Sequence, residues 1–587
     1  MNQLTLWVIL VLLQRENLSQ SFTQPLEHDF IIVGGGTAGC LLAARLSEVP
    51  EWKVLLIEAG GEENLLTDVP LAGPFSILTW LNWGYLTEKN DTFGLGLKNG
   101  RLVWPRCKIL GGTSVMNAMA YSRGNRRNYD SWAKIGNEGW DYENILNYFK
   151  KSERMSISSL ESDTKYHSTK GELDINYPPY RSAIANAFIA ASLENGTQYI
   201  DYNAQRQSGV SYVQATMKNG RRLSSNRAFL QPVRKRRNLH VITRSLVTKI
   251  LIDKDKKAYG VEYKLFNLIT LKAYAKNEII LSAGTANSAQ LLMLSGIGPQ
   301  DHLKTLNIPV VQDLKVGDNM QDHVSMLNFN FVVNSSVDIR LDNPFNLVKD
   351  IFYYVKDGKG ELTVPSGFEA LSFIDIGEQD NFPEIEFFFS GQLLPAIPLY
   401  LSPLGFLSKR FNEFYKPLAS RNGFTIFPIL LRPHSSGRLR LKDSDPHSNP
   451  LIYPDFFSDP RDIEILIKGI RMFMSLMKTE SFQKLGVDVY RKPIPPCKHH
   501  GFDSDEYWEC TIRYMTVSMQ HAVGTCKMGP DSDPDAVVDP RLKVRGIQNL
   551  RVVDASIMPS ITSGHTMAPI YMIAEKAADM IKEDNGK

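Results

Sequence analysis

A glycine-rich turn between a strand and a helix is the feature that most constrains the fold of this chain. The mostly apolar run Asp29–Val33 has the composition of a short buried strand, and it enters the glycine-rich segment 34–39. Apolar residues at helical spacing follow, and a second strand-like run, Val54–Ile57, ends at Glu58. The order of strand, glycine turn, helix, strand and acid predicts a βαβ unit.

The spacing of this turn is G-x-G-x-x-G, which indicates a dinucleotide site. Gly34 and Gly36 allow backbone N–H groups to approach a pyrophosphate at the N-terminus of the helix, and Gly39 allows the helix to pack close to the strand. Glu58 follows Gly36 by 22 residues, near the ~20 typical of an acid that accepts the ribose hydroxyls. The motif predicts a bound dinucleotide but does not distinguish FAD from NAD.

Composition places the chain among globular proteins of more than one domain. Of its 587 residues, 43% are hydrophobic and 22% charged, which is enough apolar material for a large core. The net charge of +3 gives no reason to expect a nucleic-acid partner. The basic run 234–237 has the composition of a localisation signal, but the N-terminus indicates a secreted protein instead.

The N-terminus has the pattern of a secretory signal peptide. Residues 4–13 read LTLWVILVLL, the length of a signal-peptide core and too short to span a bilayer. We expect a signal peptide over residues 1–21, cleaved after Ser21; an uncleaved anchor or a buried first helix is the alternative. No other apolar run reaches ~18 residues, so we expect no membrane span. Three Asn-x-Ser/Thr sequons follow, at Asn90, Asn195 and Asn334.

The cysteines are too sparse for a disulfide framework, because the chain has only five. Cys497 and Cys510 could close a short loop in an oxidising compartment. The alternative is a metal site of Cys497 with His499 and His500, but that spacing matches no usual zinc pattern. We therefore expect no metal.

The other segments predict a mixture of strands and helices. Strand-like runs occur at 239–253, 278–281 and 549–553. The segment 217–221 contains the Asn-Gly tip of a hairpin, and the Phe- and Pro-rich segment 331–430 predicts alternating strands and loops. A final helix is predicted over 569–582.

Four later segments carry motifs of a known enzyme family. They are PRCKILGGTSVMN at 105–117, GTANSAQLLMLSGIG at 284–298, HAVGTCKMG at 521–529 and SGH at 563–565. In this order they resemble the signature and active-site sequences of the glucose–methanol–choline (GMC) flavin oxidoreductases. The resemblance runs from Asp29 to Lys582, and the C-terminal sequence is similar to that of the insect branch of glucose dehydrogenases and alcohol oxidases.

The resemblance implies an α/β fold, α+β overall, with a doubly wound, Rossmann-like FAD-binding domain and a substrate domain on an antiparallel sheet. It divides the chain into an N-terminal FAD-binding region at 28–325, a substrate-domain segment at 326–432 and a C-terminal region with the active-site histidines at 433–582. It also selects FAD over NAD as the cofactor.

The same resemblance implies which residues contact FAD through backbone donors, an acid for the ribose and small polar groups. These residues are Gly34, Gly36, Thr37, Ala38, Gly39, Glu58, Thr113, Asn117, Val247, Asp554, Ala555 and Thr566. For Val247 the alternative is an ordinary buried strand residue. In relatives with histidine-linked flavin, that histidine precedes the position of Asn117; here Met116 stands there, which predicts non-covalent FAD.

Two histidines are the predicted catalytic residues. Oxidation of an alcohol needs a base for the hydroxyl proton, and an imidazole with a pKa near ~6.5 suits that task. His521 lies in a glycine-rich turn, and His565 follows 44 residues later. By resemblance we assign proton abstraction to His521, and we expect His565 to orient the alcohol oxygen.

The function implied by the resemblance is that of a secreted FAD-dependent oxidoreductase that converts a primary or secondary alcohol to the carbonyl. Oxygen or another acceptor would reoxidise the flavin. Three alternatives stay open: a hydroxynitrile lyase on the same scaffold, a soluble NAD-dependent dehydrogenase and a catalytically inactive secreted binding protein. The motifs do not distinguish sugar, aromatic, terpenoid and steroid alcohols as substrates.

Overall fold

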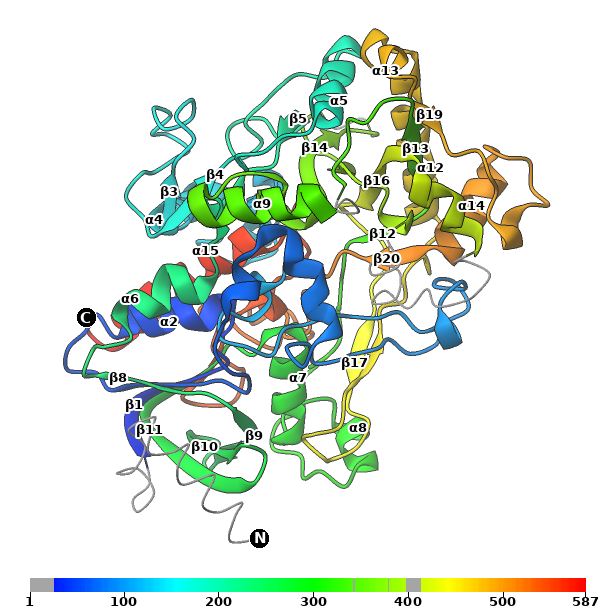
Figure 1. Ribbon diagram of the computed structural model, residues 1–587. Coiled ribbons are helices and arrows are strands. Elements are labelled where there is room, and N and C mark those ends of the chain that lie inside the picture. The colour runs from blue at the N-terminus through cyan, green and yellow to red at the C-terminus, as the bar shows by residue number, and fades with distance from the viewer. Residues whose placement is uncertain (1–25, 341–343, 378–379, 397–412) are drawn as a thin grey trace, which may run out of the picture.

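The structure, a computed structural model, describes residues 26–340, 344–377, 380–396 and 413–587. The predicted signal peptide at 1–21 lies outside the described residues. Two large sheets divide the molecule, one at the lower left of Figure 1 and one at its top. Their core clusters are separate, so each sheet has its own packed interior.

The first sheet is built around the predicted βαβ unit. Its strands lie in the order β8-β2-β1-β11-β10-β9, and β21 pairs with β11. The bounds are β1 Leu26–Val33, β2 Val54–Ile57, β8 Leu239–Ile242, β9 Ser245–Ile252, β10 Ala258–Leu265, β11 Ile269–Leu281 and β21 Leu550–Val552. The pairs β8–β2, β2–β1, β1–β11 and β11–β21 are parallel, whereas β9, β10 and β11 form an antiparallel meander. This arrangement confirms the predicted βαβ unit.

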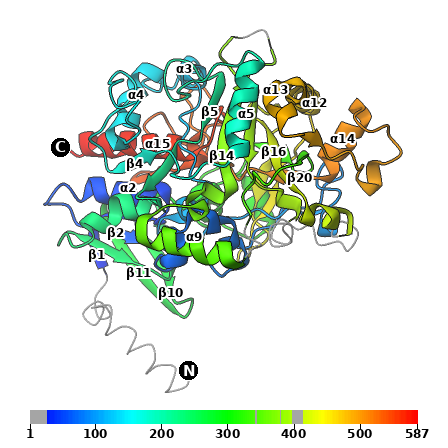
Figure 2. The ribbon, with the colours of Figure 1, turned by 45° about the horizontal axis from the view of Figure 1, so that its top comes forward.

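The first sheet and the helices packed on it form what we call the first body. Its first and last helices lie side by side, as both views show (Figure 1, Figure 2). They are α2 (Thr37–Leu46), directly after the glycine turn, and α15 (Met567–Asp584). Arg45 of α2 is joined to the fully buried Glu575 of α15 at 2.7 Å, so the buried carboxylate is paired. The final helix is thus present as predicted and extends two residues further at each end.

The second sheet is antiparallel throughout, as predicted for the substrate domain. Its order is β19-β13-β16-β15-β14-β5, with β12 paired to both β16 and β20. The bounds are β5 Gly209–Tyr212, β12 Val324–Met326, β13 Asn330–Val333, β14 Phe368–Ile374, β15 Ile385–Ser390, β16 Asn422–Leu430, β19 Asp488–Val489 and β20 Thr516–Ser518.

Strand β15 shows how this sheet is packed, because alternate residues of a strand point to opposite faces. Phe387 and Phe389 contact Phe473 of α12 (Arg461–Ser475) and Phe188 of α5 (Ala183–Glu194), respectively. The even-numbered residues face the other way, toward the first body. The helices thus cover one face of the sheet, and the other face is available for a site.

The other α-helices and strands connect and flank these sheets. The helices are α3 Arg126–Lys134, α4 Tyr142–Ser152, α6 Gln231–Val233, α7 Gly284–Leu294, α8 Gln300–Thr305, α9 Pro344–Asp357, α13 Glu480–Lys484 and α14 Asp505–Tyr514. The strands are β3 Glu153–Met155, β4 Leu173–Asn176, β6 Ala215–Lys218, β7 Arg221–Arg222, β17 Arg438–Arg440 and β18 Leu451–Tyr453. The pairing of β6 with β7 confirms the hairpin predicted at 217–221.

Helix α9 corrects the prediction of alternating strands and loops over 331–430. The segment contains strands β13 to β16 as expected, but residues 344–357 are helical. Val348, Ile351, Phe352 and Val355 have the spacing of one helix face. The sequence contains this helical periodicity. The Phe-rich composition of the segment favoured a prediction of strands, because aromatic residues are common in strands.

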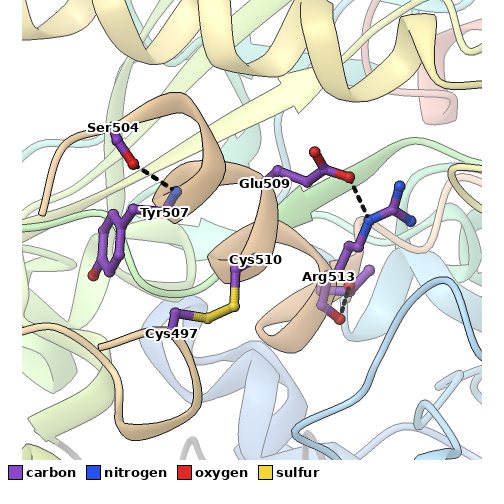
Figure 3. Close-up of a disulfide and its surroundings, with 7 residues drawn as sticks. Cys497, Ser504, Tyr507, Glu509, Cys510 and Arg513 are labelled. Atoms are coloured by element: carbon purple, nitrogen blue, oxygen red, sulfur yellow. Dashed lines mark hydrogen bonds and ion pairs between the residues drawn. A yellow bond between two sulfur atoms is a disulfide. The ribbon is translucent and has the colours of Figure 1, made fainter. Parts of the chain in front are cut away.

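A disulfide joins Cys497 to Cys510 and so ties a short turn (η12, Pro495–Cys497) to α14 (Figure 3). Ser504 caps the same helix by accepting a hydrogen bond from the backbone N–H of Tyr507 at 3.1 Å. Because Cys497 is bonded, it has no thiolate to offer a metal together with the neighbouring histidines. The described part of the chain holds no cluster of three metal-ligating side chains.

Among the described residues, no helix is both long enough and apolar enough to cross a bilayer.

Candidate active site

A deep cavity lies at the carboxyl ends of β1, β2 and β11 and extends to the antiparallel sheet. This is the edge at which doubly wound sheets bind ligands. The predicted site residues on its wall are Gly34, Gly36, Thr37, Ala38, Glu58, Thr113, Asn117, Val247, Asp554, Ala555, Thr566, His521 and His565. Gly39 does not reach the wall: a Cβ there would lie 1.9 Å from the carbonyl oxygen of Gly34, so its role is the close packing of α2 against the end of β1.

The glycine turn leaves an open cradle at the N-terminus of α2. A Cβ on Gly34 would lie 2.6 Å from the carbonyl oxygen of Ser282, so the fold itself requires glycine there. A Cβ on Gly36 would meet nothing closer than 3.8 Å. Gly36 is the N-cap residue and has no side chain to cap the helix, so the first backbone N–H groups of α2 are available to a phosphate. These features fit a dinucleotide pyrophosphate.

Glu58 stands at the end of β2, where a dinucleotide ribose would lie. Its two carboxylate oxygens accept the backbone N–H groups of Gly35 and Gly60, both at 2.7 Å. Burial raises the pKa of Glu58 to about 6. Each carboxylate oxygen has a second lone pair, so Glu58 can still accept a ribose hydroxyl.

Asp554 and Asn117 serve the wall differently. The carboxylate of Asp554 accepts hydrogen bonds from Gly284 at 2.8 Å, from Ser288 at 2.6 Å and from Ser556, so it joins α7 to the turn after β21. Asn117 Oδ1 accepts from Arg222 at 2.9 Å. These bonds hold the wall in shape, and they leave mainly backbone and amide groups to face a ligand.

His521 and His565 meet at the other end of the cavity, with ring centroids 4.8 Å apart. A third histidine, His323, supports the first: its Nδ1 lies 2.9 Å from Nδ1 of His521. Its Nε2 lies 3.1 Å from the carbonyl oxygen of Leu431, which can only accept, so Nε2 of His323 carries the hydrogen.

The tautomer of His521 follows from this chain of contacts. Burial is the main cause that lowers the pKa of His323 to about 3, so that ring is neutral and its Nδ1 is an acceptor. Nδ1 of His521 must then donate, and Nε2 of the neutral His521 ring is left without a hydrogen. Burial, with the nearby rings of His565 and His323, also lowers the pKa of His521 well below its usual value. A neutral imidazole with an unprotonated Nε2 can act as a proton acceptor.

Asp322, the residue before His323, holds the backbone of His521 by hydrogen bonding. One carboxylate oxygen of Asp322 accepts the backbone N–H of His521 at 2.7 Å. The other accepts from the hydroxyl of Ser518 at 2.6 Å and from the indole N–H of Trp104 at 3.1 Å. Asp322 and His323 therefore position the backbone and the ring of His521, respectively.

His565 is held by a carboxylate from the antiparallel sheet. Its Nε2 lies 2.9 Å from Oε1 of Glu386 on β15, and both side chains are almost fully buried. A carboxylate accepts the N–H of Nε2, which leaves Nδ1 as the remaining polar atom of the ring.

Sequence reasoning missed Asp322, His323 and Glu386. The Asp-His pair was visible in the sequence, but nothing in its spacing connects it to a histidine 198 residues later. Glu386 lies in an apolar strand, and a lone acid inside such a run was its only signal.

Comparison with known proteins gives consistent matches over almost the whole chain. Two family models of GMC oxidoreductases match, one at residues 28–325 and the other at 433–574. Glucose dehydrogenase (FAD, quinone) of Drosophila pseudoobscura pseudoobscura is 39% identical over 563 residues, which cover 95% of this chain and 87% of that protein. Ecdysone oxidase of Spodoptera littoralis is 35% identical over 567 residues, covering 94% of this chain and 91% of that protein.

A solved structure gives the same result. Pyridoxine 4-oxidase from Mesorbium loti matches with a TM-score of 0.79 at 28% identity, over 94% of this chain and 98% of that chain. The matches confirm the predicted fold class, the similarity to the insect branch and FAD as the cofactor. Because both family regions match in order over most of the sequence, the chain belongs to the GMC oxidoreductases, FAD-dependent enzymes that act on alcohols and related CH–OH donors.

Proposed function

We propose that the protein is a secreted alcohol oxidoreductase in which His521 takes the hydroxyl proton while a hydride leaves the carbon that carries the hydroxyl group. The observation that carries this proposal is the meeting of His521, with its unprotonated Nε2, and His565 beside the dinucleotide cavity. FAD, when bound, supplies the acceptor for the hydride. The substrate is a small primary or secondary alcohol.

The three histidines and Glu386 have distinct roles in this proposal. His323 keeps the hydrogen of His521 on Nδ1, so Nε2 is always the atom that receives the proton. Once protonated, His521 donates a charge-assisted hydrogen bond to His323, which stabilises the imidazolium. Glu386 holds the ring of His565, which orients the alcohol oxygen by hydrogen bonding.

Several features of the wall support tight but non-covalent FAD. The N–H groups after Gly36 would hold the pyrophosphate, Glu58 the ribose, and Thr113 and Asn117 the ribityl chain and ring edge. Met116 also lines the cavity, at the position of the histidine in relatives with histidine-linked flavin, and it supplies no imidazole for that link. The division into an FAD-binding region at 28–325, a substrate segment at 326–432 and a C-terminal region at 433–582 is part of the same proposal.

Anaerobic mixing with an alcohol tests the redox function. The oxidised flavin absorbance should bleach as the alcohol is converted, whereas a hydroxynitrile lyase or an inactive binding protein would leave it unchanged. Admission of air distinguishes the acceptors: stoichiometric hydrogen peroxide indicates an oxidase, and recovery only with an added quinone indicates a dehydrogenase. No bleaching by any primary or secondary alcohol would refute the proposal.

Secretion is supported by the disulfide and by the sequons. Disulfides persist mainly in oxidising compartments, and Asn195 and Asn334 are exposed. The mature protein should therefore begin near Phe22, carry glycan on at least one sequon and accumulate in the medium of expressing cells. An intact Met1 on a protein confined to the cytosol would contradict secretion.

A further inference from the structure

Three phenylalanines on adjacent strands form a continuous aromatic surface in the cavity. Phe388 of β15 stands directly opposite Phe427 of β16 in the register of the sheet. Phe368 of β14 stacks on Phe388, with centroids 3.9 Å apart and ring planes within 6°. Phe368 also meets Phe427 edge-on at 5.5 Å, and all three line the cavity. We call these three residues the aromatic wall.

The aromatic wall lies beside the two histidines rather than beside the glycine turn. The ring of Phe388 is 4.8 Å from the ring of His565, which is itself 4.8 Å from that of His521. Glu386 and Phe388 are two residues apart on β15, so they point to the same face. A molecule whose hydroxyl reaches the histidines must therefore place the rest of its body near the aromatic wall.

Most of the lining at this end of the cavity is apolar; its polar side chains besides the histidines include Ser366, Gln520 and Ser518, whose hydroxyl is bonded to Asp322. Among the described lining residues, β14, β15 and β16 contribute only the aromatic wall. Further apolar side chains from other segments line the same cavity: Ala118, Met119, Leu327, Leu394, Val517 and Met519. The carboxylates on the described wall belong to Glu58, which accepts the backbone N–H groups of Gly35 and Gly60, and to Asp554, which is bonded to the first turns of α7.

A sugar and a hydrocarbon alcohol would differ in their free energy of binding to such a surface. Each sugar hydroxyl buried against the aromatic wall would lose its hydrogen bonds to water without gaining a partner there, and such losses are costly. A phenyl ring or hydrocarbon chain would instead gain from leaving water and, if aromatic, from stacking on the wall.

We propose that the substrate is an apolar alcohol whose aromatic or extended hydrocarbon group rests on Phe368, Phe388 and Phe427, and that it is not a sugar. This inference rests on the proposed alcohol oxidation. It goes further by naming the part of the substrate that is recognised and the residues that recognise it.

The first test uses the FAD-loaded enzyme and a series of straight-chain primary alcohols from ethanol to hexanol, with benzyl alcohol and glucose. Each added methylene should raise kcat/KM roughly fourfold, until the cavity is filled, because each methylene is transferred from water to an apolar surface. Benzyl alcohol should exceed glucose in kcat/KM by at least roughly a hundredfold, since the sugar hydroxyls lack partners.

The second test reads binding without turnover. The tertiary alcohols 2-phenylpropan-2-ol and tert-butanol cannot lose a hydride, and they differ only by a phenyl group in place of a methyl group. In equilibrium titrations followed by the absorbance change of the bound flavin, the phenyl compound should bind at least roughly tenfold more tightly than tert-butanol. Phe427→Leu should reduce this ratio several-fold, whereas the same change at the exposed Phe352 of α9 should leave it unchanged.

The outcomes separate this inference from the proposed function. A flat alcohol series, equal affinities for the two tertiary alcohols, or glucose as the better substrate would overturn the aromatic wall as the recognition surface. Any of these results would leave alcohol oxidation by His521 intact. If no alcohol bleaches the flavin but the phenyl compound still binds more tightly, the wall stands as a binding surface and the proposed function fails. If Phe427→Leu does not fold, the two unmodified-enzyme series still decide the question.

Discussion

Two glycines of the same turn differ in what requires them. Gly34 has φ +99° and no space for a Cβ, so Gly34→Ala should lower stability whether or not FAD is present. Gly36 has space for a Cβ in the protein itself, and only a ligand at the helix N-terminus would occupy that space.

We therefore predict that Gly36→Ala folds with near-normal apoprotein stability but binds FAD roughly 10- to 100-fold more weakly, as expected for losing a hydrogen bond to a charged group. The ratio of flavin to protein absorbance after purification, with the thermal midpoint of the apoprotein, measures both effects. A fully yellow Gly36→Ala protein would show that the pyrophosphate does not lie at this turn.

His323 tests whether the tautomer of His521 matters. In His323→Asn, the amide oxygen can still accept from Nδ1 of His521, whereas His323→Leu has a similar volume and no acceptor. We predict that His323→Leu lowers the rate of flavin reduction by roughly 10- to 100-fold, as for other positioning partners of a functional histidine, and that His323→Asn retains most of it. Substrate affinity should change little in either. Equal rates in the two variants, whether fast or slow, would refute the assigned role.

At the scale of elements, the disulfide is the feature whose removal is easiest to predict. It closes a loop with a sequence separation of 13 residues between η12 and α14, on the outer side of the antiparallel sheet. In the loop-entropy description, Cys510→Ser should lower the free energy of unfolding by about 3 kcal/mol. FAD content should not change, because neither element lines the cavity.

Denaturant unfolding with and without reductant provides the control. Reductant should shift the wild-type transition toward that of Cys510→Ser and leave the variant where it is. Identical transitions for the oxidised wild type and the variant would mean that the bond contributes nothing to stability.

How well elements could be predicted depended on how local their signals are. The strand, glycine turn and helix at Asp29–Leu46 are contiguous, and their composition indicates their structure directly. His521 and His565 each lie in a short segment whose sequence resembles a family motif, so each could be found from the sequence. Glu386 has no such segment: its function arises only because β15 places it against His565, 179 residues away. Pairings of this kind depend on tertiary structure, which local patterns do not encode.

At the scale of the whole molecule, the fold assembles the site from distant parts of the chain. Strand β21 pairs with β11, and Asp554 directly after it binds the N-terminus of α7. The antiparallel sheet then closes the cavity with the aromatic wall, and its Glu386 holds His565. The first body thus provides the dinucleotide cradle, the second provides the surface for the substrate, and the histidines lie where the two meet.

Anaerobic stopped-flow reduction of the flavin by a good alcohol substrate tests whether His521 is the base. His521→Ala should retain FAD and reduce it roughly 10²–10⁴-fold more slowly than the wild type. Because burial lowers the pKa of His521, its neutral form persists into acid, so the wild-type rate should be flat at neutral pH and fall only with a midpoint below 6.5. A His521→Ala protein that reduces its flavin at the wild-type rate, with the same pH profile, would show that His521 is not the base.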